Sequence, residues 1–179
     1  YRTIKDKRTR LIKAFKPGGW VSVSEPKEED IRLLEELGVD PSFIEDALDP
    51  DELPRIEKAK GFIYVILNTP CREKGKIFNI PLLVGVGRDA FVVLSRRKID
   101  FIETIIKDPR TYTTQKAKNL LKVCLKITNS YTREIRRINK EINAKKVSLS
   151  KLKNQDIAAF VELEEGLNEF ITAIVALIG

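Results

Sequence analysis

Residues 115–145 contain neither glycine nor proline, and this uninterrupted stretch constrains the fold more than any other feature of the sequence. Its mostly apolar positions recur every seven residues, in one row of Ala117, Cys124, Tyr131 and Ile138 and a second of Leu121, Thr128, Ile135 and Ile142. A seven-residue repeat of this length predicts one long helix with a coiled-coil-like seam.

The long helix is expected to end at residues 145–153, where the sequence KKVSLSKLK breaks the pattern. A second helix is predicted after the break, with inward-facing side chains at Ile157, Phe160, Leu167, Ile171 and Ile174. Two long helices joined by a short loop form an antiparallel hairpin. We therefore expect residues 111–179 to be a helical hairpin.

The first 110 residues alternate short apolar runs with turn residues, which indicates strands. A turn at Lys60-Gly61 should join two of them. The predicted strands are residues 10–15, 20–23, 54–59 with Ile56 as the buried member, 62–67 as a central strand covered on both faces, and a hairpin of 75–86 and 90–95.

Three short helices are predicted among these strands. The first is capped by Ser24, carries Pro26 in its first turn and ends at Gly38. The second begins after Asp40 and ends at Asp49, and the third covers residues 100–107. The expected fold is α+β: a mixed sheet with flanking helices, an α/β/α sandwich over residues 1–110, followed by the long antiparallel helical hairpin.

Composition excludes several kinds of chemistry. The 179 residues include no histidine, which excludes Ser-His-Asp and Cys-His catalysis and histidine-based zinc sites. Cys71 and Cys124 stand far apart and outside any C-x-x-C pattern, which is typical of reduced thiols. Because the chain begins at Tyr1 and lacks methionine, we expect a fragment trimmed from a longer protein.

Acidic side chains gather in one stretch of a chain whose net charge is +7. Carboxylates bind hard cations such as Mg²⁺, but the glycine and terminal glutamate of an EF-hand are missing here. Three interpretations stay open: a solvated loop, part of a cation site completed by another element or subunit, and a carboxylate-based hydrolase. The stretch from residue 43 to 57 contains Glu45, Asp46, Asp49, Asp51, Glu52 and Glu57.

Basic side chains gather elsewhere. Residues 115–153 hold twelve Lys and Arg residues against Glu134 and Glu141. A basic helix can follow phosphate groups, so a nucleic-acid-binding module is the alternative function. Tyr131 is the only aromatic residue of the long helix and lies on its seam, so aromatic side chains for base stacking are absent. We therefore expect no nucleic acid as a partner.

The order of motifs in the first 70 residues resembles the cytosolic domain of CorA-type magnesium transporters. That family shows a strand ending in Trp, a helix closed by Gly, a hydrophobic-Glu-Asp-x-Leu helix, a Pro-Arg/Lys-hydrophobic-Glu strand and an aromatic-rich strand. The corresponding parts here are Trp20, Gly38, 44–48, 54–57 and 62–67. The downstream hairpin is similar too, so the resemblance covers nearly the whole chain.

The resemblance implies the cytoplasmic regulatory domain of a homopentameric channel in the cell membrane, and not an enzyme. The cargo is implied to be Mg²⁺, with Co²⁺ and Zn²⁺ as alternatives, and Mg²⁺ bound between subunits would stabilise the closed pore. Asp46 and Glu45 are the implied metal ligands, with Asp49 as a further candidate. No catalytic or cofactor-binding residue is implied, and the stalk and membrane helices are expected beyond Gly179.

The sequence departs from the family at one implied ligand. A further acidic ligand is expected near the start of the first long helix, but residues 115–132 contain no Asp or Glu, and Lys122 and Lys126 occupy that region. The main partner carboxylate of the family lies on the stalk helix, outside this chain. Glu45 and Asp46 are therefore expected to form only half of a site between subunits.

Overall fold

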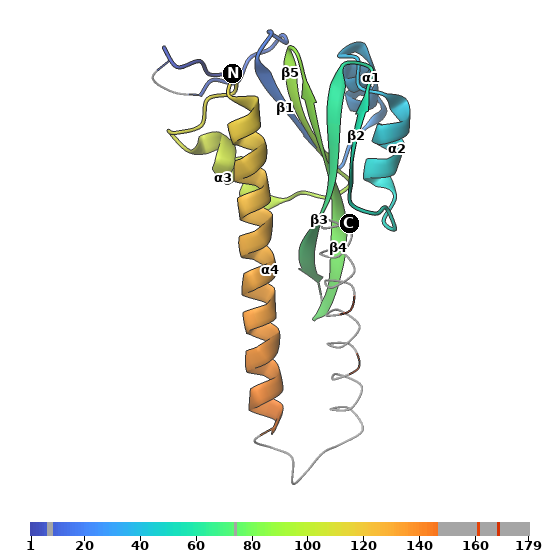
Figure 1. Ribbon diagram of the computed structural model, residues 1–179, viewed down its shortest axis with the longest axis vertical. Helices are drawn as coiled ribbons and strands as arrows, with labels where there is room; N and C mark the ends of the chain where they lie inside the picture. Colours follow the sequence, from blue (N-terminus) through green and yellow to red (C-terminus); the bar gives the residue numbers. More distant parts are fainter. Residues whose placement is uncertain (7–8, 74, 147–160, 162–167, 169–179) are drawn as a thin grey trace.

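In the computed structural model, the chain forms a mixed sheet with helices on both faces (Figure 1). The structure describes residues 1–6, 9–73 and 75–146, together with 161 and 168. The elements are β1 (Gly19–Ser24), α1 (Glu28–Glu36), α2 (Pro41–Leu48), β2 (Arg55–Ala59), β3 (Phe62–Glu73), β4 (Lys76–Gly87), β5 (Ala90–Ser95), α3 (Asp100–Lys107) and α4 (Lys116–Lys146).

The strands of the sheet follow the order β1-β5-β4-β3-β2, with β1 parallel to β5 and the other pairs antiparallel. Lys60 and Gly61 form the tight turn between β2 and β3 with φ angles of 46° and 82°, as their sequence predicts. β3 and β4 pair along their whole length. β2 pairs only with the end of β3 near Phe62, and β5 pairs only with the end of β4 near Gly87. The other halves of β3 and β4 form a two-stranded ribbon.

Two hydrophobic cores lie on opposite faces of the sheet, because successive side chains of a strand point to opposite sides. Tyr64 and Ile66 of β3 belong to the core under α1 and α2. Val65 and Leu67 belong to the core under α3 and α4. The predicted α+β class and the α/β/α arrangement are therefore confirmed. Cys71 and Cys124 are free, as expected.

α4 confirms the predicted long helix but not the whole of its predicted seam. Its buried apolar side chains are Val123, Ile127, Tyr131 and Ile138. Ala117, Leu121 and Thr128 are exposed instead. An α-helix drifts by about 20° per heptad from a strict 3.5-residue repeat, and α4 packs on the sheet of β3 and β4, so the heptad rows fail in the first half of the helix.

The second helix of the predicted hairpin falls outside the described residues. The loop after Lys146 and the proposed inward-facing positions Ile157, Phe160, Leu167, Ile171 and Ile174 all lie in that part of the chain. The hairpin therefore stays a prediction.

Three local predictions are wrong for identifiable reasons. Residues 10–15 form no strand, and Leu11 is fully exposed. Ser24 does not cap α1, because its backbone pairs with β5 as the last residue of β1, and α1 begins at Glu28. Ile56 is 69% exposed rather than buried, because β2 is an edge strand of the sheet.

Candidate functional site

α2 positions the predicted metal ligands. Asp40 caps the helix by accepting a hydrogen bond from the Ser42 backbone N–H at 3.2 Å, and Pro41 fills the first helical position. The apolar side of α2 is buried against the sheet through Phe43, Ile44 and Ala47. The opposite side therefore faces solvent with its carboxylates.

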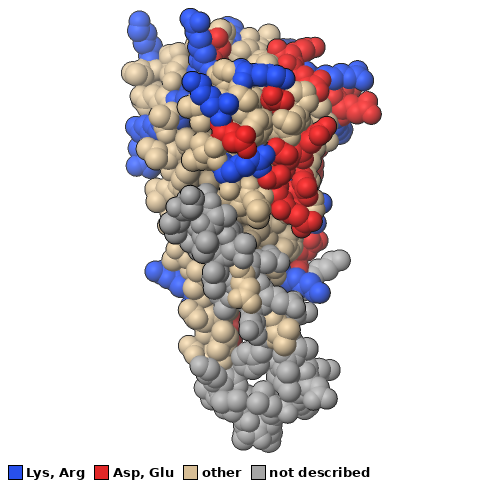
Figure 2. Space-filling model, turned by 45° about the vertical axis from the view of Figure 1, so that its right-hand side comes forward, with Lys and Arg blue, Asp and Glu red and all other residues tan. Residues whose placement is uncertain are grey.

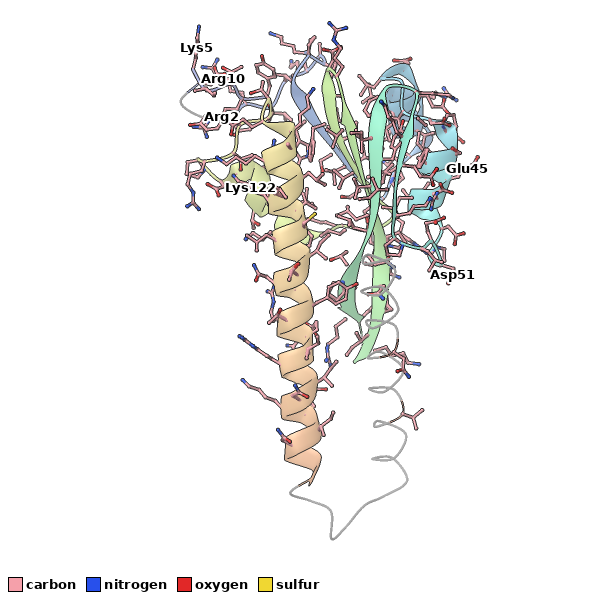
Figure 3. The ribbon with its side chains drawn as sticks, in the orientation of Figure 1. Arg2, Lys5, Arg10, Glu45, Asp51 and Lys122 are labelled. Carbon is pink, nitrogen blue, oxygen red and sulfur yellow. The ribbon has the colours of Figure 1, made fainter. Side chains whose placement is uncertain are left out.

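The two adjacent carboxylates of α2 lie in different surroundings. Glu45 is exposed and forms no ion pair within the described residues, and it points away from the sheet (Figure 3). Asp46 is half-buried and lies next to β2, where its Oδ2 is 2.5 Å from Nη2 of Arg55. A separation of about 100° around the helix axis explains why neighbours in sequence reach such different places.

Arg55 collects three carboxylates, and we call this group the Arg55 cluster. Besides Asp46, the guanidinium contacts Glu52 through Nη1 and Glu57 through Nε. The guanidinium also lies over the ring of Phe43, with Cζ 5.6 Å from the ring centroid. Burial alone would lower the pKa of Arg55, but the Glu57 hydrogen bond and the charges of Glu52 and Asp46 outweigh it and raise that pKa.

Asp49 and Asp51 lie in the exposed loop after α2. Asp49 Oδ1 accepts a hydrogen bond from the Asp51 backbone N–H at 3.0 Å, which forms a local turn. The structure does not gather Asp46, Asp49 and Asp51 in one pocket. The geometry that a carboxylate-based hydrolase needs is therefore not seen here.

A single chain offers an incomplete cation site. Among the described residues, no three His, Cys, Asp or Glu side chains are arranged to hold a metal ion. Mg²⁺ often keeps several waters and takes only one or two protein carboxylates. The donor set of α2 therefore fits a Mg²⁺ ion only in part, and the remaining ligands must come from water or from another chain.

Negative charge spreads beyond α2 over one side of the molecule. Figure 2 shows Asp and Glu side chains gathered where α1 and α2 lie. α1 adds three acidic side chains in its first turn, Glu28, Glu29 and Asp30. This acidic side attracts cations by a long-range field as well as by direct ligation.

Lys122 occupies the position where the resemblance implies an acidic ligand. Its side chain is hydrogen-bonded to the loop between α3 and α4. Its Nζ donates to Arg110 O at 3.0 Å and to Thr111 Oγ1 at 2.6 Å. Burial lowers the pKa of Lys122, and the nearby Asp108 opposes that change. Lys122 therefore fixes the loop between α3 and α4, while Lys126 stays exposed.

The sequence predictions did not include the Arg55 cluster with its three carboxylates. Glu52 and Glu57 lie three and two residues away in sequence, so their charge pattern around Arg55 was a readable signal. A second arginine cluster was missed entirely. Nε of Arg72 on β3 lies 3.1 Å from Glu134 Oε2, and its Nη1 lies 3.1 Å from Glu141 Oε1, both on α4.

Sequence comparison identifies related proteins. The family model described as CorA-like Mg2+ transporter protein matches residues 18–177. The cobalt/magnesium transport protein CorA of Methanocaldococcus jannaschii is 26% identical over 130 residues, which cover 69% of this chain and 41% of that protein. The chain thus spans about two-fifths of the length of that curated relative.

Structural comparison gives the same fold. The soluble domain of CorA from Methanocaldococcus jannaschii superposes with a TM-score of 0.77 at 23% identity, covering 88% of this chain and 66% of that chain. The cytoplasmic domain of ZntB from Vibrio parahaemolyticus gives a TM-score of 0.64 at 13% identity, covering 98% and 72%. Within the part of this chain that the structure describes, no helix is long and apolar enough to cross a bilayer.

Proposed function

This chain belongs to the CorA-like Mg2+ transporter protein family, and from that membership we propose that it is the ion-sensing regulatory domain of a divalent-cation transporter. Mg²⁺ would act as cargo and as gate ligand, with Co²⁺ or Zn²⁺ as alternative cargo. The chain spans 41% of the curated relative, so the activity of the whole transporter is part of the proposal.

One observation carries the proposal: α2 presents Glu45 to solvent beside the half-buried Asp46. One or two such carboxylates suit a Mg²⁺ ion that keeps part of its water shell. An ion shared by two subunits stabilises the closed assembly if it binds the closed state more tightly than the open state. The stabilisation equals the difference between the two binding free energies. Asp49, at the end of α2, is a further candidate ligand.

Arg55 gives the two carboxylates different roles. Glu45 can bind an ion directly. Asp46, whose Oδ2 lies 2.5 Å from Nη2 of Arg55, can bind an ion only if its carboxylate is shared with the guanidinium or released from it. Mg²⁺ binding at Asp46 would therefore compete with the contact between α2 and β2. Such competition couples ion binding to the packing of α2 on the sheet.

The assembly belongs to the same proposal. We propose a homopentamer in the cell membrane, with residues 1–110 as its cytoplasmic regulatory unit. Residues 111–179 would form the hairpin that leads toward the stalk and membrane helices. The activity is transport rather than catalysis, in keeping with the family.

Flux measurements on the full-length protein in liposomes test the proposal. The double variant Glu45→Gln/Asp46→Asn should need at least about fivefold more Mg²⁺ on the cytoplasmic side to inhibit flux, the lower end of typical coupling free energies. The control variant Glu36→Gln removes an exposed carboxylate of α1 and should behave as wild type. Equal inhibition of the double variant and wild type would show that α2 is not the sensor, and a wild type without Mg²⁺ flux would overturn the transport assignment.

A further inference from the structure

A cleft of about 950 Å³ lies on the α3–α4 side of the sheet, on the opposite face from α2. Its walls are the ribbon part of β3 at residues 69–72, the segment entering α3 at residues 98–101, and a stripe of α4 between Asn129 and Lys140. This volume falls in the range of small-molecule sites, roughly 300–1,000 Å³.

The lining of the cleft is strongly basic. Two acidic side chains, Asp100 and Glu134, line it. The basic residues on α4 recur at three- and four-residue intervals, so they share one face of the helix. Six cationic side chains line the cleft: Arg72, Lys98, Arg133, Arg136, Arg137 and Lys140.

Arg72 occupies the carboxylates that α4 provides. It pairs with Glu134 and with Glu141, and Arg137 shares Glu134 at 3.5 Å. Within the described residues, Lys98, Arg136 and Lys140 consequently form no salt bridge. The cleft therefore keeps an excess of positive charge that the described part of the chain does not neutralise.

Within the described residues, one buried donor in this wall lacks an acceptor. Nη2 of Arg72 is buried and has no hydrogen-bond partner in that part of the chain, whereas its Nε and Nη1 are bound to carboxylates. Buried polar groups are normally hydrogen-bonded, so an unpaired guanidinium N–H in a cationic cleft indicates a missing acceptor. Asn129 adds a neutral amide donor to the same wall, while the hydroxyls of Ser130 and Thr132 donate within α4 to Lys126 O and Thr128 O.

The cleft also has an apolar part, formed by Pro70, Ile80, Ile99 and Phe101. Guanidinium groups bind phosphate oxygens in a fork geometry, and apolar and aromatic side chains accept the organic part of a ligand. From this combination we propose that the cleft binds a phosphate-bearing small molecule of the nucleoside polyphosphate class. The inference does not depend on the proposed function, because no carboxylate of α2 takes part.

Calorimetric titration of the 179-residue chain tests the site. The probes are sodium tripolyphosphate and ATP, each with EDTA present so that divalent ions play no part. Arg136→Glu/Lys140→Glu reverses two cations of the cleft that make no salt bridge in the described residues. It should lower the affinity for both probes about tenfold or more, as expected when two charge-assisted contacts are reversed.

A matched control separates the cleft from net charge. Lys118→Glu/Lys126→Glu makes the same charge change at exposed positions of α4 that do not line the cleft, and it should change the affinity less than about twofold at moderate salt. Equal losses in both double variants, or no saturable binding of either probe to wild type, would overturn the proposal. Tighter binding of ATP than of tripolyphosphate supports a role for the apolar part.

A phosphate ester can also belong to a lipid headgroup. Flotation with vesicles that contain phosphatidic acid distinguishes this source from a soluble nucleotide. Vesicle binding that only the cleft variant loses would support the phosphate site with a lipid as its ligand. Binding to duplex DNA that both double variants lose equally, without binding of the small probes, would overturn it in favour of a general basic surface.

Discussion

Two arginines organise carboxylates on opposite faces of this sheet, and their surroundings have opposite charge. Arg55 lies among Asp46, Glu52 and Glu57 on the acidic side of α1 and α2. Arg72 holds two glutamates of α4, but further cations surround that pair in the cleft. The same kind of ion pair therefore leaves excess negative charge in one region and excess positive charge in the other. The first region therefore attracts cations and the second attracts anions.

The difference in burial between the two clusters predicts the largest effect on stability. Arg72→Gln should lower the free energy of unfolding by about 2–4 kcal/mol, because it leaves Glu134, whose side chain is only 14% exposed, without its main partner. Urea denaturation measures the loss. Arg137→Gln removes a 58% exposed partner of the same glutamate and should cost less than about 1 kcal/mol. Equal losses of unfolding free energy in the two variants would contradict this prediction. The ion pair of Arg72 would then contribute no more to stability than an exposed surface pair.

The Arg55 cluster predicts a smaller loss together with a new property. Arg55→Gln should lower stability by about 1–2 kcal/mol, since the Arg55 side chain is 31% exposed and solvent screens the pairs. Without the guanidinium the three carboxylates repel one another, so millimolar Mg²⁺ should raise the melting temperature of this variant more than that of wild type. Lys58→Gln, an exposed change on the same strand, should show no such gain. If Mg²⁺ left the melting temperature of Arg55→Gln unchanged, the guanidinium would not occupy a position where a metal ion can bind.

The cap of α2 predicts the smallest effect, and one that depends on pH. The hydrogen bond from the Ser42 backbone N–H is the main reason that the pKa of Asp40 is lowered. A lowered pKa in the folded state adds stability above the ordinary carboxyl pKa of about 3.9, and this stability is lost as pH falls through the folded value. Asp40→Ala should therefore melt below wild type near neutral pH, with the gap closing in acid. A gap that is constant from neutral pH to pH 3 would show that the charge of Asp40 contributes nothing.

Local patterns predicted most of the fold. The absence of glycine and proline predicted α4, and the Asp40-Pro41 pair predicted the start of α2, because helix continuity and capping depend on neighbours in sequence. The exposure of Ile56 could not be predicted in this way. It depends on β2 being an edge strand, which only the order of the whole sheet determines.

The candidate sites were predictable to different degrees. Glu45 and Asp46 were readable from their motif, but the contact that ties Asp46 to Arg55 joins two elements that only the fold brings together. Arg72 lies 62 residues from Glu134 in sequence, and no local signal connects them. The basic cleft combines β3, the start of α3 and α4, so its charges were visible in the sequence but its shape was not.

Paramagnetic broadening by Mn²⁺ tests whether the carboxylates of α2 bind a divalent cation. Amide signals of the isotopically labelled chain would be recorded at rising Mn²⁺, which replaces Mg²⁺ at oxygen sites. We expect that signals of residues 43–49 broaden first and that Glu45→Gln/Asp46→Asn removes this effect, while the cleft on the opposite face is unaffected. Broadening centred away from α2, or broadening that persists in the double variant, would contradict it.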